Sequence, residues 1–276
     1  MALLIVVPAR YGSTRLPGKP LREIAGVPML LRTARNAQDA ADALEQAEVV
    51  VATDDARIEA FCAEHALPCV MTSADLATGS DRALAAANAL DPDTARIDRI
   101  VNLQGDAPFT PAGHITRVAR ELGRNGADAA TAYVQLDWDA LDALREHKQT
   151  APFSGTTLIE DADGFAVWFS KAIIPAIRKE EAHRAEPLSP VKRHIGLYGY
   201  RRDVLARFAA LPESRYERLE GLEQLRLLEA GYRMACARVE RPRISLGGID
   251  TQADIDLAER LIAEHGDPFS GGPHRG

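Results

Sequence analysis

Short apolar runs alternate with longer segments of helical periodicity through the first half of the chain. Strands are predicted at residues 3–7, 49–52, 69–71 and 98–103, and helices at 29–44, 58–65, 80–90 and 112–122. The aliphatic run 3–7 is typical of a strand that is buried on both faces. Because parallel strands need crossovers as long as these helices, the pattern predicts an α/β fold with a doubly wound, mostly parallel sheet.

After about residue 127 the pattern becomes richer in strands. Strands are predicted at 130–136, 156–160, 165–169, 194–200 and 234–239, and helices at 202–210, 221–230 and 252–265. Asp161-Ala162-Asp163-Gly164 predicts a hairpin turn, and the polar stretch 179–190 predicts a mobile loop. We expect a single domain over 1–266, in which about 1–126 and 202–266 form the core and about 127–201 form an inserted β-rich subdomain. Residues 267–276 are expected to be a flexible tail.

Composition narrows the class of protein. The 276 residues are 46% hydrophobic and 26% charged, the balance of a globular chain. Acidic residues outnumber basic ones by 40 to 33, which argues against a broad nucleic-acid face. The three cysteines form no C-x-x-C pair, so neither a disulfide framework nor a zinc site is predicted. No apolar stretch approaches the roughly 20 residues of a membrane span, and we expect a cytoplasmic protein without membrane insertion.

The loop that follows the first strand is rich in cations. Residues 1–22 contain Arg10, Arg15, Lys19 and Arg22 and no acidic residue. Ligands of doubly wound sheets bind at the carboxyl ends of the strands, where fixed cations and backbone N–H groups favour phosphate. The loop matches neither the ATPase phosphate loop nor the dinucleotide fingerprint. A solvated basic loop is the alternative.

The run P-A-R-Y-G-S-T-R-L-P-G-K-P-L at 8–21 resembles the signature of the 3-deoxy-manno-octulosonate (Kdo) cytidylyltransferases, the CMP-Kdo synthetase family. Further similar segments follow in the family's order over about residues 3–260: 52–54, 71–82, 102–106, 169–175, 193–200, 222–226 and 248–251. The resemblance implies a Rossmann-like nucleotidyltransferase fold whose inserted subdomain binds the sugar and forms a homodimer. It also implies transfer of CMP from CTP to the anomeric hydroxyl of the acidic sugar, for lipopolysaccharide, with release of pyrophosphate.

The same resemblance implies the residues of the nucleotide site. Catalysis is assigned to Arg10, Lys19, Asp106 and Asp250, and Mg²⁺ to Asp106 and Asp250, whose hard oxygen ligands suit this ion when phosphates complete its shell. For either aspartate a turn or helix cap is the alternative. The residues assigned to the nucleotide are Pro8, Ala9, Arg10, Gly12, Ser13, Arg15, Lys19, Thr72, Ser80, Arg82 and Gln104.

The sugar side is implied in the same way, and each residue has a structural alternative. His194 and Tyr198 alternate with apolar residues and could pack in the core, Glu223 and Gln224 could lie on a solvated helix face, and Lys171 and Arg178 could be surface charges. The residues assigned to the sugar acid are Gln104, Lys171, Arg178, His194, Tyr198, Glu223 and Gln224.

Four departures from the family pattern affect the acceptor. Ala107 stands in place of a usual glutamate, Leu76 of a histidine, Thr157 of a lysine and Lys171 of an arginine. A modified Kdo-like sugar acid, or another anionic acceptor of a specialised pathway, is therefore an alternative to Kdo. A non-catalytic nucleotide-binding relative is a further alternative, although the four residues assigned to catalysis are intact.

Overall fold

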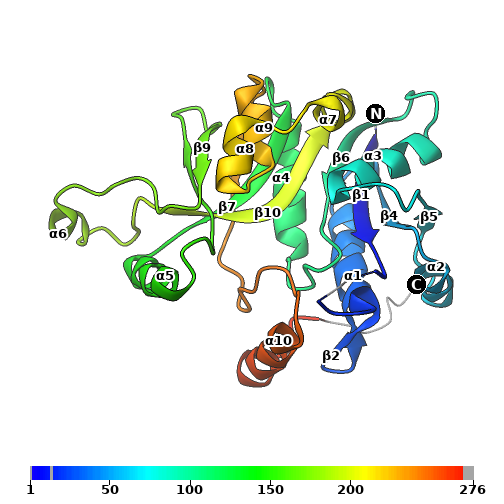
Figure 1. Cartoon of the computed structure of the whole chain (residues 1–276), viewed down its shortest axis with the longest axis horizontal. Helices are drawn as coiled ribbons and strands as arrows, with labels where there is room; N and C mark the ends of the chain where they lie inside the picture. The colour runs from blue at the N-terminus through cyan, green and yellow to red at the C-terminus, as the bar shows by residue number, and fades with distance from the viewer. Residues whose placement is uncertain (1, 13–14, 270–276) are drawn as a thin grey trace. The chain divides into compact units, whose positions relative to one another are not determined.

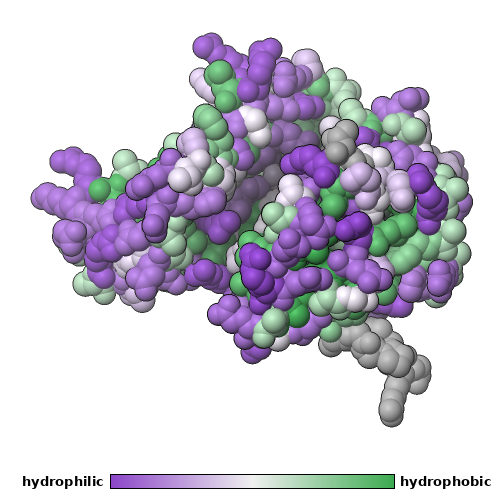
Figure 2. Space-filling model, turned by 60° about the horizontal axis from the view of Figure 1, so that its bottom comes forward, coloured by the Kyte–Doolittle hydropathy of each residue, from purple (hydrophilic) through white to green (hydrophobic). Residues whose placement is uncertain are grey.

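The computed structural model describes residues 2–12 and 15–269 (Figure 1). The chain forms two compact units, residues 1–116 with 241–276 and residues 117–240. Within the described ranges no helix is both long and apolar enough to cross a bilayer. Hydrophilic side chains cover most of the face drawn in Figure 2, and the apolar side chains of the strands are largely buried.

The first unit is built on four parallel strands. They lie in the order β6 (Ile97–Asn102), β1 (Ala2–Ala9), β4 (Ala47–Thr53) and β5 (Cys69–Met71). Seven of the eight β1 residues are buried, as expected of a strand covered on both faces. The predicted parallel α/β sheet is confirmed, and it aligns the carboxyl ends of β1, β4 and β6.

Helices cover this sheet. α1 (Met29–Asp42) contacts β1 and β4, and α3 (Gly79–Leu90) contacts β1, β4 and β6. α2 (Ala56–Glu64) packs on β5, and α10 (Gln252–His265) packs on the hairpin of β2 (Glu23–Ile24) and β3 (Val27–Pro28). This hairpin and the short helix η1 (Lys19–Leu21) were not predicted, because elements of two or three residues have no periodicity to detect. α4 (Ala112–Leu122) spans the boundary between the units.

The second unit has a mixed sheet. β7 (Ala129–Gln135) pairs in parallel with β11 (Met234–Arg238) and antiparallel with β10 (Lys192–Arg201). β8 (Thr157–Glu160) pairs with β10 and forms a hairpin with β9 (Ala166–Ser170). The predicted turn is confirmed: Gly164 has a φ of 75°, and the Phe165 N–H donates to the Asp161 carboxylate at 2.8 Å.

The helices of the second unit differ partly from the prediction. α7 (Arg202–Ala210) is confirmed, and the helix expected at 221–230 is present in shorter form as α9 (Gln224–Glu229), while α8 (Arg215–Glu220) before it was not predicted. Gly221, in the left-handed region, ends α8. α5 (Trp138–Thr150) and the short α6 (Glu180–His183) were not predicted.

The expected loop at 179–190 is tied to α5 by ion pairs. Arg145 and Arg184 both bind Glu180 and Asp142. The pKa of Glu180 is lowered to about 2 by its hydrogen bonds from Arg145 and Arg184.

Two expected boundaries are corrected. Residues 202–240, expected in the core with the first half of the chain, belong to the second unit, because β11 pairs with β7 and α7 packs on β10. The expected flexible tail is anchored over its first three residues. Arg32, which is 1% exposed, donates to both Asp267 carboxylate oxygens at 2.7 and 2.8 Å and stacks on Phe269. Residues 270–276 lie outside the described residues.

Candidate functional site

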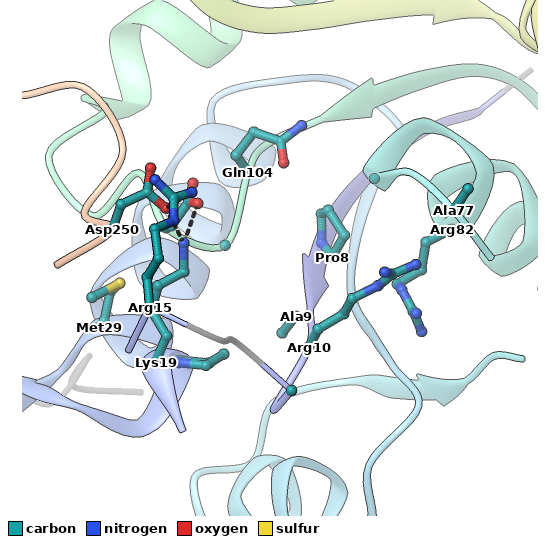
Figure 3. Close-up of a pocket in the computed structure, with 15 residues that line it drawn as sticks. Pro8, Ala9, Arg10, Arg15, Lys19, Met29, Ala77, Arg82, Gln104 and Asp250 are labelled. Carbon is teal, nitrogen blue, oxygen red and sulfur yellow. Dashed lines mark hydrogen bonds and ion pairs between the residues drawn. The ribbon is translucent and has the colours of Figure 1, made fainter. Parts of the chain in front are cut away.

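A cavity of about 520 Å³ opens in the first unit at the carboxyl ends of β1 and β6 (Figure 3). This is the edge at which open α/β sheets bind ligands. Four cations and two carboxylates line it, so its charge favours an anion. The lining residues are Pro8, Ala9, Arg10, Gly12, Arg15, Lys19, Pro20, Met29, Ala77, Gly79, Arg82, Gln104, Gly105, Asp106 and Asp250.

Lys19 joins the two carboxylates that the sequence singled out. Its Nζ donates to Asp106 Oδ2 at 2.6 Å and to Asp250 Oδ1 at 2.9 Å (Figure 3). Burial lowers the pKa of Lys19, but the hydrogen bonds and charges of both aspartates outweigh it and raise that pKa above its usual value. The ammonium therefore stays charged, and it bridges Asp106 and Asp250 in this structure.

The backbone brings these carboxylates together. Gly105 passes so close to β1 that an added Cβ would lie 2.4 Å from the Pro8 carbonyl oxygen, so only glycine fits there. The Ile249 N–H donates to the Asp106 carbonyl at 2.9 Å, which fixes the segment carrying Asp250 beside Asp106. Thr251, and not Asp250, is the N-cap of α10. The cap alternative for Asp250 is thereby excluded, and its carboxylate is left to face the cavity.

Two arginines extend the positive charge of the cavity. Arg15 is largely exposed, and its Nη2 lies 3.1 Å from Asp250 Oδ1. Arg10 Nη2 is buried and has no hydrogen-bond partner among the described residues. A buried guanidinium N–H without an acceptor is costly, so Arg10 has a donor that an anion in the cavity could satisfy.

Arg82 is held more firmly than Arg10. It is fully buried, its Nη1 donates to Thr72 Oγ1, and its Nη2 donates to Asp54 at 2.8 Å. Burial lowers the pKa of Arg82, and the Asp54 charge partly offsets this. Asp54 is a partner that the sequence reasoning did not assign, although it lies in one of the segments that resemble the family.

The structure gathers most, though not all, of the predicted nucleotide residues. Thr72 and Ser80 do not line the cavity: Thr72 bonds Arg82 and the Thr53 carbonyl, and Ser80 is buried in the first turn of α3. Ser13 lies outside the described residues. Sequence reasoning missed Pro20, Met29, Ala77, Gly79 and Gly105, all of which except Met29 belong to segments it had matched.

Five of the residues predicted for the sugar lie on three elements of the second unit or beside them. Tyr198 Oη donates to Gln224 Oε1 at 3.2 Å, and Gln224 Nε2 is buried without a partner among the described residues. The His194 ring lies 5.5 Å from that of Tyr198, and its Nε2 is 2.8 Å from Thr131 Oγ1. Thr131 was missed, because the alternation of a strand indicates which residues share a face and not their partners.

The charge of this cluster follows from burial. Desolvation, and then the Lys171 charge, lower the pKa of His194 to about 3, so the imidazole is neutral at pH 7. Desolvation and the Glu223 charge raise the pKa of Tyr198, which stays a phenol. Lys171 thus supplies the positive charge beside neutral hydrogen-bonding groups.

The other two predicted sugar residues lie elsewhere. Arg178 is exposed, and no described contact joins it to this cluster. Gln104 lines the cavity of the first unit, where its side chain lies against Gly79.

The described residues contain no group of three His, Cys, Asp or Glu side chains with metal-ligand geometry. Asp106 and Asp250 nevertheless converge on one cation, the Lys19 ammonium. Two carboxylates fit a magnesium ion whose other ligands are phosphate oxygens and water.

Residues 4–238 match the family model described as cytidylyltransferase. The chain is 42% identical to the 3-deoxy-manno-octulosonate cytidylyltransferase of Xanthomonas campestris over 95% of its own length and 89% of the relative's. It is 40% identical to the enzyme of the same name from Rhodopseudomonas palustris, over 95% of this chain and 98% of the relative. The solved structure of a CMP:2-keto-3-deoxy-manno-octonic acid synthetase complexed with CTP has a TM-score of 0.79 at 32% identity, covering 96% of this chain and 99% of that one.

Proposed function

The chain belongs to the cytidylyltransferase family, and from this we propose that it transfers CMP from CTP to the anomeric hydroxyl of Kdo and releases pyrophosphate. The observation that carries the proposal is the cationic cavity of the first unit with its paired carboxylates. The solved relative that is named as a complex with CTP has the same fold over nearly the whole chain.

The reaction is a displacement at phosphorus. The anomeric hydroxyl gives up its proton to solvent as its oxygen bonds to the α-phosphorus of CTP, the bond from that phosphorus to the bridging oxygen breaks, and pyrophosphate leaves. Such chemistry depends on positioning and charge neutralisation. We assign Arg10 and Arg15 to the triphosphate, because Arg10 has an unused buried donor and Arg15 is exposed to the cavity.

We assign Mg²⁺ to Asp106 and Asp250. When bound, the ion would neutralise phosphate oxygens and help to lower the pKa of the attacking hydroxyl. Lys19 now occupies the point between these carboxylates. We propose that its ammonium turns to the phosphates when the carboxylates take a metal ion, which reconciles the assignment of Lys19 to the nucleotide with its position in this structure.

The acceptor is assigned to the cluster in the second unit. Lys171 provides a cation for the sugar carboxylate, and neutral His194, Tyr198 and Gln224 provide donors and acceptors for hydroxyls. The unpartnered Gln224 Nε2 is an N–H group available to such a hydroxyl.

A modified Kdo-like acid is a second candidate acceptor. Lysine at position 171 lacks the fork with which arginine grips a carboxylate. Thr157, where the family usually has lysine, is buried and bonds the Ala172 carbonyl at 2.7 Å. Both observations concern the acceptor and leave the nucleotide site unaffected.

We further propose that the protein is a cytoplasmic homodimer. The β8–β9 hairpin and α8 expose Val167, Tyr216 and Leu219 by 55%, 44% and 69%, and the Tyr216 ring packs edge-on against Trp168. An apolar group of this kind is typical of an interaction surface. The three free cysteines suit a reducing compartment.

The decisive experiment measures pyrophosphate release with CTP, Mg²⁺ and a panel of acceptors: Kdo, amino-substituted Kdo analogues and acceptor-free buffer. Turnover of Kdo with CTP supports the first proposal. Preference for an amino sugar supports the second. If neither kind of acid causes pyrophosphate release, both proposals are contradicted. Replacing CTP with ATP, GTP and UTP tests the base, and light scattering of the same sample tests the dimer.

A further inference from the structure

Lys148, on α5, directs its ammonium group at four backbone carbonyl oxygens of the second unit. Nζ donates to the carbonyls of Lys171 at 2.6 Å, Gly155 at 3.0 Å and Ser154, and it lies 3.2 Å from that of Pro152. We call these four oxygens the carbonyl nest. Rings of backbone carbonyls also replace the hydration shell of monovalent cations in proteins. The nest therefore has the chemistry of a cation site, filled by a side chain of the same protein.

The carbonyl nest joins two loops that flank the proposed sugar cluster. One is 152–155, which leads into Thr156, whose carbonyl accepts the His194 N–H at 2.9 Å. The other begins at Lys171. The ammonium of Lys148 thus connects the backbone supporting His194 with the backbone supporting Lys171.

The amide side of Lys171 is held separately. Its N–H donates to Glu220 at 2.7 Å, and Glu220 also accepts the Ser170 hydroxyl at 2.8 Å. The next residue is held by Thr157, through the Ala172 carbonyl. The Lys171 carbonyl depends on Lys148, so removing that ammonium frees one side of the residue and leaves the other fixed.

Among the described residues, the hydrogen-bond partners of this ammonium are carbonyl groups and not carboxylates. Burial lowers the pKa of Lys148, the charges of Lys171 and Arg193 lower it further, and Glu220 offsets part of this. The cation is thus kept in a positively charged neighbourhood, which indicates that it serves the geometry of the loops.

We propose that Lys148 is a positioning residue whose ammonium acts as a built-in cation, closing the carbonyl nest and fixing Lys171 beside His194 for the acceptor's carboxylate. The assignment of that carboxylate rests on the proposed function. The nest and its response to cations do not.

The first test is kinetic. In Lys148→Ala the KM for the acceptor rises about tenfold, the factor expected when a hydrogen bond to a charged group is lost, while the KM for CTP is unchanged. Potassium or methylammonium chloride restores part of the acceptor affinity, and choline chloride at equal ionic strength does not. Lys179→Ala, which removes an exposed lysine of the same unit, keeps wild-type constants.

The second test needs no activity. The Tm of Lys148→Ala falls and recovers in potassium or methylammonium relative to choline, while the Tm of the wild type is the same in all three salts. Lys148→Gln is measured alongside, so that the proposal stays testable if the alanine variant is insoluble. The proposal would be overturned if both variants had the Tm and the acceptor KM of the wild type. It would also be overturned if their losses of stability and acceptor affinity were not reversed by any small cation. A salt-dependent Tm in a protein that uses no acceptor would support the nest and contradict the proposed function.

Discussion

The ammonium group of Lys19 lies 2.6 Å from the carboxylate of Asp106, across a cavity in which cations outnumber acids. The carboxylate of Asp250 accepts a hydrogen bond from the same ammonium at 2.9 Å. Under the proposed function, substrate phosphates and these carboxylates would compete for the Lys19 ammonium, and substitutions of either carboxylate test this.

Asp106→Asn is expected to lower kcat about 100-fold or more, because a neutral amide would hold the proposed Mg²⁺ less tightly than a carboxylate does, and that ion would neutralise the charge of the transferring phosphoryl group. Pyrophosphate release at saturating CTP and Mg²⁺ measures the loss. Asp93→Asn removes an exposed carboxylate elsewhere in the first unit and should keep full activity. Retention of activity by Asp106→Asn, in a folded protein, would contradict the proposed role of Asp106 as a metal ligand.

Arg10→Met is expected to raise the KM for CTP about tenfold or more, since a charged hydrogen bond to phosphate is lost. The variant should not be less stable than the wild type, because it removes a buried N–H that has no partner among the described residues. Nucleotide titration and Tm measure the two effects. Arg120→Met, at an exposed arginine on α4, is the control. An equal rise in its KM for CTP would show that the overall charge of the protein, and not a contact of Arg10, is responsible.

Gly105→Ala is expected to destabilise the protein by about 1–3 kcal/mol and to reduce turnover, because the new methyl group would displace the Pro8 backbone and with it the wall of the cavity. Gly113→Ala is the matched control. Its Cβ would meet nothing within 4 Å, and it lies in a helix, where alanine is favoured. Denaturant unfolding of both variants measures the contrast, and equal stabilities would contradict it.

His194 is expected to remain neutral through the pH range in which an ordinary histidine titrates. Because burial and the charge of Lys171 lower its pKa to about 3, its imidazole signals should not shift between about pH 5.5 and 8. Nitrogen NMR, assigned by comparison with His194→Gln, tests this. A midpoint near 6.5 would mean that the ring is hydrated.

Asp267→Asn is expected to cost about 2 kcal/mol, because the buried Arg32 guanidinium loses its counter-ion while Asp267 is partly exposed. Arg32 lowers the pKa of Asp267 from 3.8. A lowered carboxyl pKa contributes stability that is complete above the unfolded value and disappears as the pH falls through the folded one. The stability difference between wild type and variant should therefore be constant at neutral pH and shrink below about pH 3.8. Guanidinium unfolding at several pH values measures it, and a difference that persists in strong acid would contradict the ion pair.

The parallel strands and the cavity could be predicted because their signals are local. Continuous aliphatic runs identify β1 and β4, and the basic loop follows β1 directly. The motif segments also placed Asp106 and Asp250 correctly at the cavity.

The rest depends on partners distant in sequence. α5 buries only Trp138, Leu141 and Leu144 within a charged segment, so its apolar stripe is weak. The second unit ends at residue 240 because β11 pairs with β7. The sequence of 234–239 predicts a strand but does not indicate which strand it pairs with. Thr72 similarly resembled a nucleotide ligand, but it is hydrogen-bonded to Arg82.

The contact of Arg32 with Asp267 and Phe269 has a practical consequence for protein engineering. A fluorescent fusion partner or affinity tag joined directly after residue 266 would remove the acid that neutralises a buried arginine, and it would weaken the fold while leaving every cavity residue in place. The same tag joined after residue 269 retains that contact. The last three described residues are thus the natural limit for trimming this protein from its C-terminal end.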